Sequence, residues 1–233
     1  MLFNFWGKKK KQQNNELYYN FDFPCEKIAE RMNNSQYTQK WKNCSRQNGF
    51  PVFIIFNKIA KELFENNVYS FEEIDIEKYL NDTLEKAKLF AEENGEDFYY
   101  IAGKETDTEN GICEFSSFDL QEDYFVLSAT IPVENPWEVF QKIPFGNYNE
   151  CPSPNIIAAF SKMAYEKFGA VPAVISADTI EFSVALPPSK EEALKLAWQI
   201  YTLCPDTVNQ GHKSIYSLAD CLTKSDVWTL WWD

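Results

Sequence analysis

The residue types best suited to nucleophilic catalysis are Cys204, in the run Cys204-Pro205-Asp206, and His212, the single histidine of the chain. A cysteine nucleophile needs a thiolate within hydrogen-bond reach of an imidazole that a third polar group orients, and Asp206 could take that third role. Cys204 also follows an apolar helix face that ends at Leu203, which favours a buried, unreactive thiol. His212 lies in a Gly-His-Lys sequence typical of a surface loop. The structural interpretation is therefore favoured over catalysis.

Four carboxylates near predicted strand ends or loops form a second set, namely Asp178, Glu181, Asp206 and Asp233. Two of them on adjacent strands could supply a general acid and a general base, or hold a divalent cation. The sequence contains no Asp-x-Asp pair, calcium-loop pattern or His-Glu pairing that would require this. Plain roles are favoured: Asp178 as a turn residue that tolerates positive φ, and Asp206 as a cap or Asx-turn. No catalytic residue, metal ligand or cofactor is predicted.

Polar side chains also lie in loops beside Gly146 and Gly211, where mobile backbone often accompanies binding. The glycines do not form either of the usual phosphate-binding patterns. Turn formation is the alternative role for these polar residues. The candidate residues for binding a ligand or partner are Asn147, Asn149, Asp178, Glu181, Asp206, Gln210 and His212.

The charge of the chain is strongly negative, at −13 in total. Four of the 22 basic residues (Lys8 to Lys11) and one of the 35 acidic residues (Glu16) lie in residues 1–20, so the rest carries 18 basic and 34 acidic side chains, a net charge of −16. Such a surface repels a phosphate backbone, so nucleic acid is not expected as a partner. A basic protein is the natural electrostatic complement, although acidity can also serve solubility alone.

Composition places the chain among folded proteins, with 45% hydrophobic and 16% aromatic residues. The six cysteines include no Cys-x-x-Cys pair, and with one histidine they do not suggest a zinc site. No apolar run approaches the ~20 residues that a membrane span needs, and the lysines follow the first apolar residues, the reverse of a secretion signal. We expect a cytoplasmic protein with reduced, mostly buried thiols.

The first half of the chain divides into a flexible leader, residues 1–20, and a mixed α/β lobe, residues 21–120. Residues 51–56 are a continuous apolar run that predicts a strand buried on both faces. A long acidic helix is predicted from a capping box at Ser70 and Glu73 to Asn94-Gly95. The aromatic run 98–101 predicts another strand, and residues 103–111 an exposed loop.

The second half, residues 121–233, has a clearer pattern. A strand at 125–131 precedes a short helix that opens at Asn135-Pro136 and a longer helix from Ser153-Pro154 to Gly169. Two strands, 171–176 and 179–186, form a tight hairpin through Ala177-Asp178. Further helices are predicted after the capping box Ser189/Glu192 and after Ser214. Trp228, Trp231 and Trp232 end the chain in a buried or half-buried strand.

This order of major elements, strand–helix–strand–strand–helix–strand, is that of the split-βαβ, ferredoxin-like arrangement. The predicted fold is α+β, with an antiparallel or mixed sheet and helices packed on it. Whether the two halves are separate domains or share one sheet stays open at this point.

Several short motifs of this second half carry a resemblance to a known family. They are Gly169 to Val174, Asp178 to Phe182, Cys204-Pro205-Asp206 with Gln210-Gly211, Trp137 with the segment Gly146 to Asn149, and Trp231-Trp232-Asp233. Together they resemble the bacterial domain-of-unknown-function family 4253, over about residues 122–233. The family has no established activity, so the resemblance implies a fold boundary and no catalytic residues. It suggests a bacterial cytoplasmic protein, with toxin immunity as one role by analogy.

Two hypotheses about function follow. The first is an acidic protein-binding module, immunity-type in one version, that neutralises a basic partner. It rests on the negative charge, the aromatic content and the lack of a convincing catalytic set. The alternative is an enzyme or small-ligand-binding protein that uses a cleft lined by Asp178, Glu181, Asp206 and His212. Catalysis is the less favoured of the two.

Overall fold

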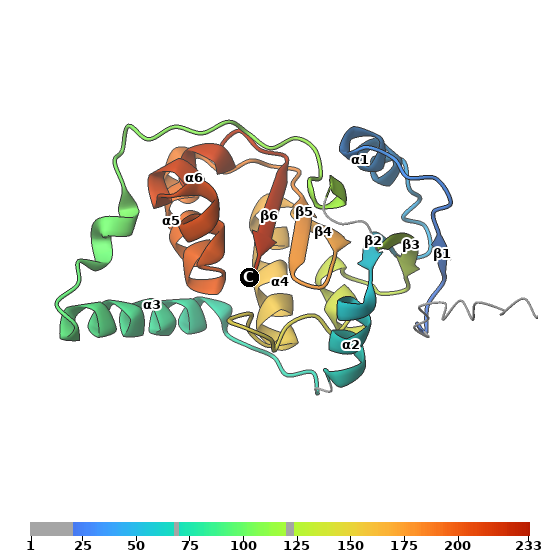
Figure 1. Ribbon diagram of the computed structural model, residues 1–233, viewed down its shortest axis with the longest axis horizontal. Helices are drawn as coiled ribbons and strands as arrows, with labels where there is room; N and C mark the ends of the chain where they lie inside the picture. Colours follow the sequence, from blue (N-terminus) through green and yellow to red (C-terminus); the bar gives the residue numbers. More distant parts are fainter. Residues whose placement is uncertain (1–20, 68–69, 120–123) are drawn as a thin grey trace, which may run out of the picture.

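The computed structural model describes residues 21–67, 70–119 and 124–233, and within them one six-stranded mixed sheet packed between helices (Figure 1). The predicted leader and its four lysines lie outside these residues. The sheet order is β1-β3-β2-β4-β5-β6. Its strands are β1 (Cys25–Lys27), β2 (Phe50–Phe56), β3 (Phe125–Ile131), β4 (Val171–Ile175), β5 (Thr179–Ser183) and β6 (Val227–Trp231).

The strand β2 lies at the centre of this sheet. It pairs antiparallel with β3 over its whole length, from Phe50 opposite Ile131 to Phe56 opposite Phe125. On its other side it pairs parallel with β4, where Phe53 lies opposite Val174. Its last six residues are buried, which confirms the strand predicted from the apolar run. An α+β fold with a mixed sheet is therefore confirmed.

The ferredoxin-like order is not confirmed. That order would let strands of residues 121–233 form a sheet among themselves, whereas β2 from residues 21–120 separates β3 from β4. The physical reason is the composition of β2: seven nearly continuous apolar residues are most stable with both faces covered and both edges paired. The division of the chain into units at residue 120 stays a prediction.

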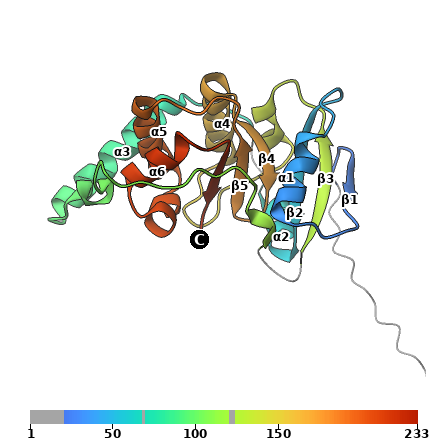
Figure 2. The ribbon, with the colours of Figure 1, turned by 90° about the horizontal axis from the view of Figure 1, so that it is seen from above.

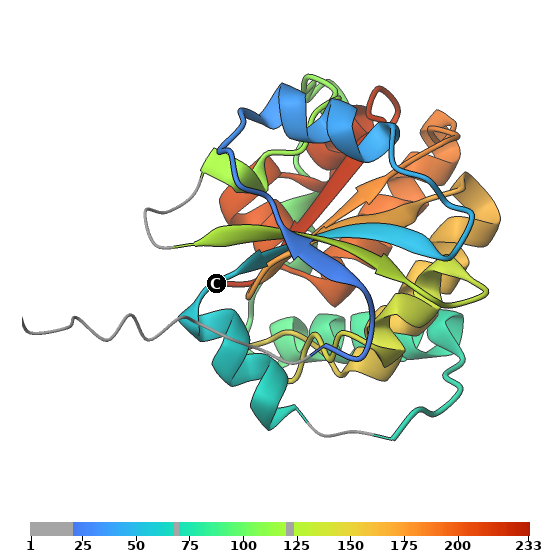
Figure 3. The same cartoon turned by 90° about the vertical axis from the view of Figure 1, so that its right-hand side faces the viewer.

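Helices cover the two faces of the sheet unequally. The helices α2 to α6, with η3 and η4, and one large core lie on the first face. On the second face, α1 and η2 cover a smaller aromatic core (Figure 3). The α-helices are α1 (Asn34–Lys42), α2 (Lys58–Asn66), α3 (Ile76–Glu93), α4 (Pro154–Phe168), α5 (Lys190–Leu203) and α6 (Ile215–Leu222). The shorter turns are the 3-10 helices η1 (Phe98–Ala102), η2 (Ser117–Asp119) and η3 (Pro136–Gln141), and the π-helical η4 (Thr207–His212).

None of the helices within the described residues combines the length and the apolar content needed to cross a membrane. The helix α3 is the longest, and Figures 1 and 2 show that its C-terminal half extends away from the sheet together with η1.

Most predicted helix starts are confirmed. The capping box of Ser189 and Glu192 opens α5, and Ser214 caps α6. The predicted helix at Asn135-Pro136 forms as the 3-10 turn η3, and α4 runs from Pro154 to its left-handed C-cap at Gly169. Local capping and turn chemistry therefore determine these boundaries.

The start of α3 differs from the prediction. The helix begins at Ile76, and its cap is Asp75, whose carboxylate accepts a hydrogen bond from the Lys78 amide at 3.1 Å. The Ser70 carbonyl instead accepts a hydrogen bond from the side chain of Asn155 on α4. The prediction of a capping box at Ser70 was wrong because Asp75 is the cap directly before the apolar helical repeat.

The strand predicted at residues 98–101 is also wrong, since these residues form η1. The Asp97 carboxylate caps this turn by accepting from the Tyr99 amide at 3.0 Å. Aromatic residues favour strands only when a neighbouring strand and a packed face are available. The chain here has just left α3, and η1 packs beside that helix at the edge of the molecule.

The predicted hairpin and the Trp-rich strand are confirmed, with one change of length. The strand β5 ends at Ser183, and Leu186 is 63% exposed rather than on the buried face. Pairing between β5 and β6 runs from Thr179 opposite Trp231 to Ser183 opposite Val227. All six cysteines are free, and Cys151, Cys204 and Cys221 are buried.

Residues 103–116, here called the strap, connect η1 on one side of the molecule to η2 on the other (Figure 1). The strap is held by side chains of the second half of the chain. The Glu109 amide donates to the Asp220 carboxylate at 2.8 Å, and the Ile112 amide donates to the Ser225 hydroxyl at 2.8 Å. Its end lies against the second face of the sheet, over Glu181.

Candidate functional site

Cys204 and His212 do not form a nucleophile–base pair. The Cys204 thiol donates to the Trp231 carbonyl at 2.9 Å and accepts from the Thr207 hydroxyl at 3.2 Å. Burial raises the pKa of the Cys204 thiol to about 11, so the thiolate is scarce at neutral pH. His212 instead faces Glu109 of the strap, with its Nδ1 atom 4.0 Å from the carboxylate. The thiol has the buried, unreactive character that the apolar helix face predicts.

His212 is not the surface residue that its Gly-His-Lys sequence suggested, because its side chain is 15% exposed. Burial lowers the pKa of its imidazole, and the Glu109 carboxylate opposes this in part.

We expect the pKa of His212 to lie below the ordinary value of about 6.5, and Glu109→Gln to lower it further. Since the chain has one histidine, its ring-proton NMR signal followed against pH measures this directly. A titration midpoint above about 6.5 would mean that the Glu109 carboxylate raises the pKa of His212 by more than burial lowers it.

Glu181 lies in the middle of β5 rather than near a strand end, and it is fully buried. Its carboxylate accepts from the amide and hydroxyl of Ser116 at 2.7 and 3.0 Å, the Ser117 amide at 3.3 Å and the Thr229 hydroxyl at 3.2 Å. Burial raises its pKa, while the hydrogen bonds from Ser116 and Ser117 act in the opposite direction. The arrangement joins the strap to the sheet.

Asp178 is part of the tight turn between β4 and β5, and its φ is not positive. Its carboxylate accepts from the hydroxyls of Ser176 and Thr179 at 2.8 and 3.0 Å. Among the described residues other than glycine, positive φ occurs at Asn147, Asn149 and Lys213. Both asparagines are exposed and occupy a tight loop, as turn formation requires.

Asp206 and Gln210 lie close together, beside Asp233, the last residue of the chain. The Gln210 amide donates to the Asp206 carboxylate at 3.0 Å, and the backbone amide of Asp233 donates to the same carboxylate at 3.0 Å. Glu181 lies apart from this group, since its neighbours Ile180 and Phe182 point into the first core and side chains alternate along a strand. Asp206 lies beside Cys204 and Val208, which belong to the first core, so Asp206 and Glu181 are on opposite sides of the sheet.

In the part of the chain that the structure describes, no group of three His, Cys, Asp or Glu side chains is placed to hold a metal ion.

A group of exposed apolar residues covers the end of α3 and η1. Leu89, Phe90, Tyr99 and Tyr100, here called the tip patch, are 56, 65, 60 and 87% exposed. Four carboxylates lie between its two halves in sequence: Glu92, Glu93, Glu96 and Asp97. No ion pair among the described residues involves these four. Several large apolar side chains exposed close together in the fold, beside charged groups, are typical of an interaction site.

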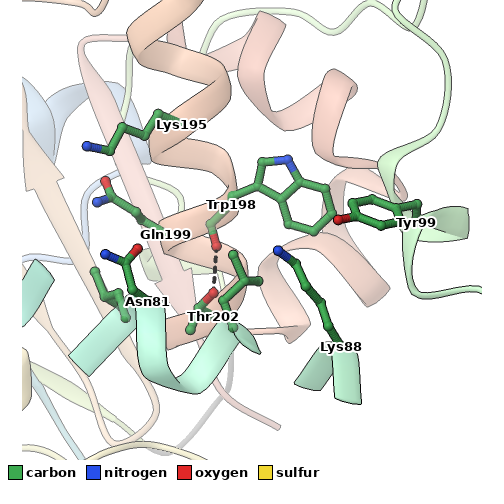
Figure 4. A pocket seen from close by; sticks show the side chains of 9 residues that line it. Asn81, Lys88, Tyr99, Lys195, Trp198, Gln199 and Thr202 are labelled. Carbon is green, nitrogen blue, oxygen red and sulfur yellow. Dashed lines mark hydrogen bonds between the residues drawn. The ribbon is translucent and has the colours of Figure 1, made fainter. Parts of the chain in front are cut away.

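A pocket of about 260 Å³ lies beside the tip patch, between α3 and α5 (Figure 4). Here called the α3–α5 pocket, it is lined by Leu80, Asn81, Leu84, Lys88, Tyr99, Lys195, Trp198, Gln199 and Thr202. The residues Ile76, Leu80, Leu84, Ala87 and Ala91 recur at helical intervals and form the apolar side of α3. The middle of α3 packs poorly against α5, since Leu84 is only half-buried and Ala87 is exposed.

Sequence reasoning missed both features. The signal was available in the run Phe98-Tyr99-Tyr100, which follows four carboxylates and a glycine and therefore has no strand pattern around it. On α5, Trp198 stands next to the main apolar face rather than on it. Only the relative position of η1 and α5 brings Phe98 and Tyr99 against Trp198.

Comparison with known families identifies the second half of the chain. Residues 128–233 match the family model described as Domain of unknown function (DUF4253). The match is limited to these residues, which are similar to that family. Its bounds agree with the resemblance over about residues 122–233. Comparisons of the chain with curated proteins and with solved structures found no match.

The DUF4253 domain as matched contains β3 from Ser128 onward, α4 to α6 and β4 to β6. The strand β2, which completes the centre of its sheet, lies outside the matched residues, as does the strap that binds Glu181. The α3–α5 pocket therefore has one wall from the DUF4253 domain and one from the preceding part of the chain.

Proposed function

We propose that this chain is an acidic protein-binding module that uses the tip patch to bind a basic protein. The observation that carries the proposal is the tip patch itself, with four large apolar side chains more than half exposed beside four unpaired carboxylates. Aromatic residues at the centre of an interface supply most of the binding free energy, and surrounding charges steer the encounter. A basic partner with an apolar contact surface fits both parts.

The position of the tip patch supports the same proposal. The helix α3 and η1 extend from the body of the molecule, so a partner can reach the patch without contacting the sheet (Figures 1 and 2). Neutralising a basic toxin in the cytoplasm, as an immunity protein does, is the specific form of this role that we favour. It agrees with the net charge of −13.

The test is affinity capture from extract of the source cells, with the whole chain immobilised and the bound proteins identified by mass. We expect a basic protein that is retained at low salt and released at high salt, because screening weakens the attraction between exposed charges. The double variant Phe90→Ser/Tyr100→Ser should weaken its affinity about tenfold or more, as expected for central aromatic contacts. Replacing Glu92, Glu93 and Glu96 with glutamine should mainly slow association.

The matched control is Ile59→Ser/Leu186→Ser, which removes two other exposed apolar side chains, 56 and 63% exposed, outside the tip patch. It should retain the partner like the native chain. Equal capture by the tip-patch variant and the native chain would reject the tip patch as the binding surface. Capture of no protein by the native chain at low salt would reject the proposed function.

A further inference from the structure

The α3–α5 pocket has a flat aromatic wall whose orientation is fixed by its neighbours. The ring of Trp198 stacks on Phe98, with centroids 5.5 Å apart and planes at 22°. Tyr99 and Tyr201 meet the same ring edge-on, at 6.2 and 6.1 Å. Three aromatic contacts hold the indole in one place, so a planar ligand would meet a preformed surface.

The charge of the pocket is opposite to that of the whole protein. Its lining contains two lysines and no carboxylate, whereas the chain carries a net charge of −13. Lys88 is paired with Glu85 at 2.8 Å, and its ammonium lies 5.9 Å from the centroid of the Tyr99 ring. Lys195 has no carboxylate within 4.0 Å among the described residues. Its charge is therefore available to a ligand.

Glu77, a carboxylate whose pKa Lys195 affects, already has an ion-pair partner of its own. Glu77 forms an ion pair with Lys167 at 2.7 Å. The hydrogen bond and charge of Lys167 lower the pKa of Glu77, and Lys195 adds a smaller effect in the same direction. Since Glu77 has its own partner, an anion in the pocket would not have to displace it from Lys195.

Lys195 and the two amide side chains of the pocket lie at one end of it. Figure 4 shows the side chains of Lys195, Gln199 and Asn81 on the same side of the pocket, and Trp198, Tyr99 and Lys88 on the other. The Thr202 hydroxyl donates to the Trp198 carbonyl at 2.9 Å and is already used. The two amide groups can donate hydrogen bonds to an oxygen anion beside Lys195.

We propose that the α3–α5 pocket binds a small organic anion that carries a flat ring. The ring lies against Trp198 and Tyr99, and a carboxylate or phosphate lies at the end formed by Lys195, Asn81 and Gln199. A pocket with a mostly apolar wall and a few convergent polar groups is the usual form of a small-molecule site, and this one suits a ligand at the lower end of the usual size range. The proposal does not depend on the protein-binding function.

The test follows the indole N–H signals of the isotope-labelled whole chain by NMR. The sequence has seven tryptophans, and Trp198→Phe identifies the signal of Trp198 by its loss. The probes share one ring and differ in the attached group: phenylacetate, phenyl phosphate and the neutral phenylacetamide. We expect a saturable shift of the Trp198 signal with at least one anion, and a much weaker effect of the amide. Comparing the two anions shows whether a carboxylate or a phosphate is the better fit.

Lys195→Met should weaken anion binding about fivefold, the upper end of what one exposed charge contributes. The matched control is Lys190→Met, an exposed lysine on the same helix that does not line the pocket, and it should bind like the native chain. Equal binding of phenylacetamide and the anions, or an unchanged affinity in Lys195→Met, would overturn the proposal, as would the absence of a saturable shift. Phe90→Ser/Tyr100→Ser should leave these shifts intact, so failure of one proposal is distinguishable from failure of the other.

Discussion

Replacing Trp232 with alanine is expected to lower the free energy of unfolding by about 3–5 kcal/mol, because it removes one of the largest buried side chains. Trp232 is 1% exposed and packs on Phe145 with ring centroids 5.5 Å apart. Its indole N–H donates to the Leu203 carbonyl at 3.2 Å, and its backbone amide donates to the Asp178 carbonyl at 3.0 Å. The side chain thus joins the end of α5 to the loop before α4. Urea unfolding followed by circular dichroism measures the loss.

The neighbouring Trp231→Ala is the matched control, since Trp231 is the same residue type and is only half-buried. The free energy of unfolding lost in Trp231→Ala should be less than half of that lost in Trp232→Ala. Trp232→Phe keeps most of the apolar volume and removes the indole donor, so it should fall between the two. Equal losses for Trp231→Ala and Trp232→Ala would contradict the burial that the structure assigns to the last residues.

The sequence predicts those elements whose signal is local. The apolar run of β2 and the caps of α5 and α6 are examples, because each depends on residues within one or two turns of chain. The terminal tryptophans predict a buried strand for a similar reason: their apolar surface is too large to leave in water. The family resemblance likewise rests on short motifs and gives the correct half of the chain.

The sheet order could not be predicted in the same way. The parallel pairing of β2 with β4 joins residues about 120 positions apart, and no local pattern selects between β4 and another partner. The aromatic run at η1 shows the opposite problem. Its local preference for a strand is clear, but no neighbouring strand is available at that edge of the molecule.

The candidate site was predicted in part. The sequence correctly assigns turn roles to Asn147 and Asn149 and a buried thiol to Cys204. The cap or Asx-turn predicted for Asp206 does not form, because its carboxylate instead accepts from the side chain of Gln210 and the backbone amide of Asp233. It does not indicate that Glu181 is buried, because alternation along β5 suggests only that it faces away from Ile180 and Phe182. The second face is covered by the strap, whose Thr-, Asp- and Glu-rich sequence is typical of an exposed loop. Burial of Glu181 therefore depends on a segment 65 residues earlier in the chain.

Glu181 is also expected to make stability depend on pH. Burial raises its pKa in the folded state above the value of ~4.3 that an unfolded chain has. The folded state therefore holds the proton more tightly, so the stabilisation is fully present below about pH 4.3. It is lost as the pH rises through the folded pKa.

Removing the side chain with Glu181→Ala should lower the free energy of unfolding by about 2–4 kcal/mol, because buried donors of Ser116, Ser117 and Thr229 lose their acceptor.

The variant that isolates the pH effect is Glu181→Gln, which keeps the shape and cannot titrate. The free energy of unfolding of the native chain, minus that of Glu181→Gln, should decrease as the pH rises from 4 to 8. For one proton the slope cannot exceed about 1.4 kcal/mol per pH unit. The exposed Glu105→Gln should show no such difference from the native chain. A difference that instead increases with pH would mean that the hydrogen bonds from Ser116, Ser117 and Thr229 outweigh burial. Glu181 would then act as a stable anion that anchors the strap.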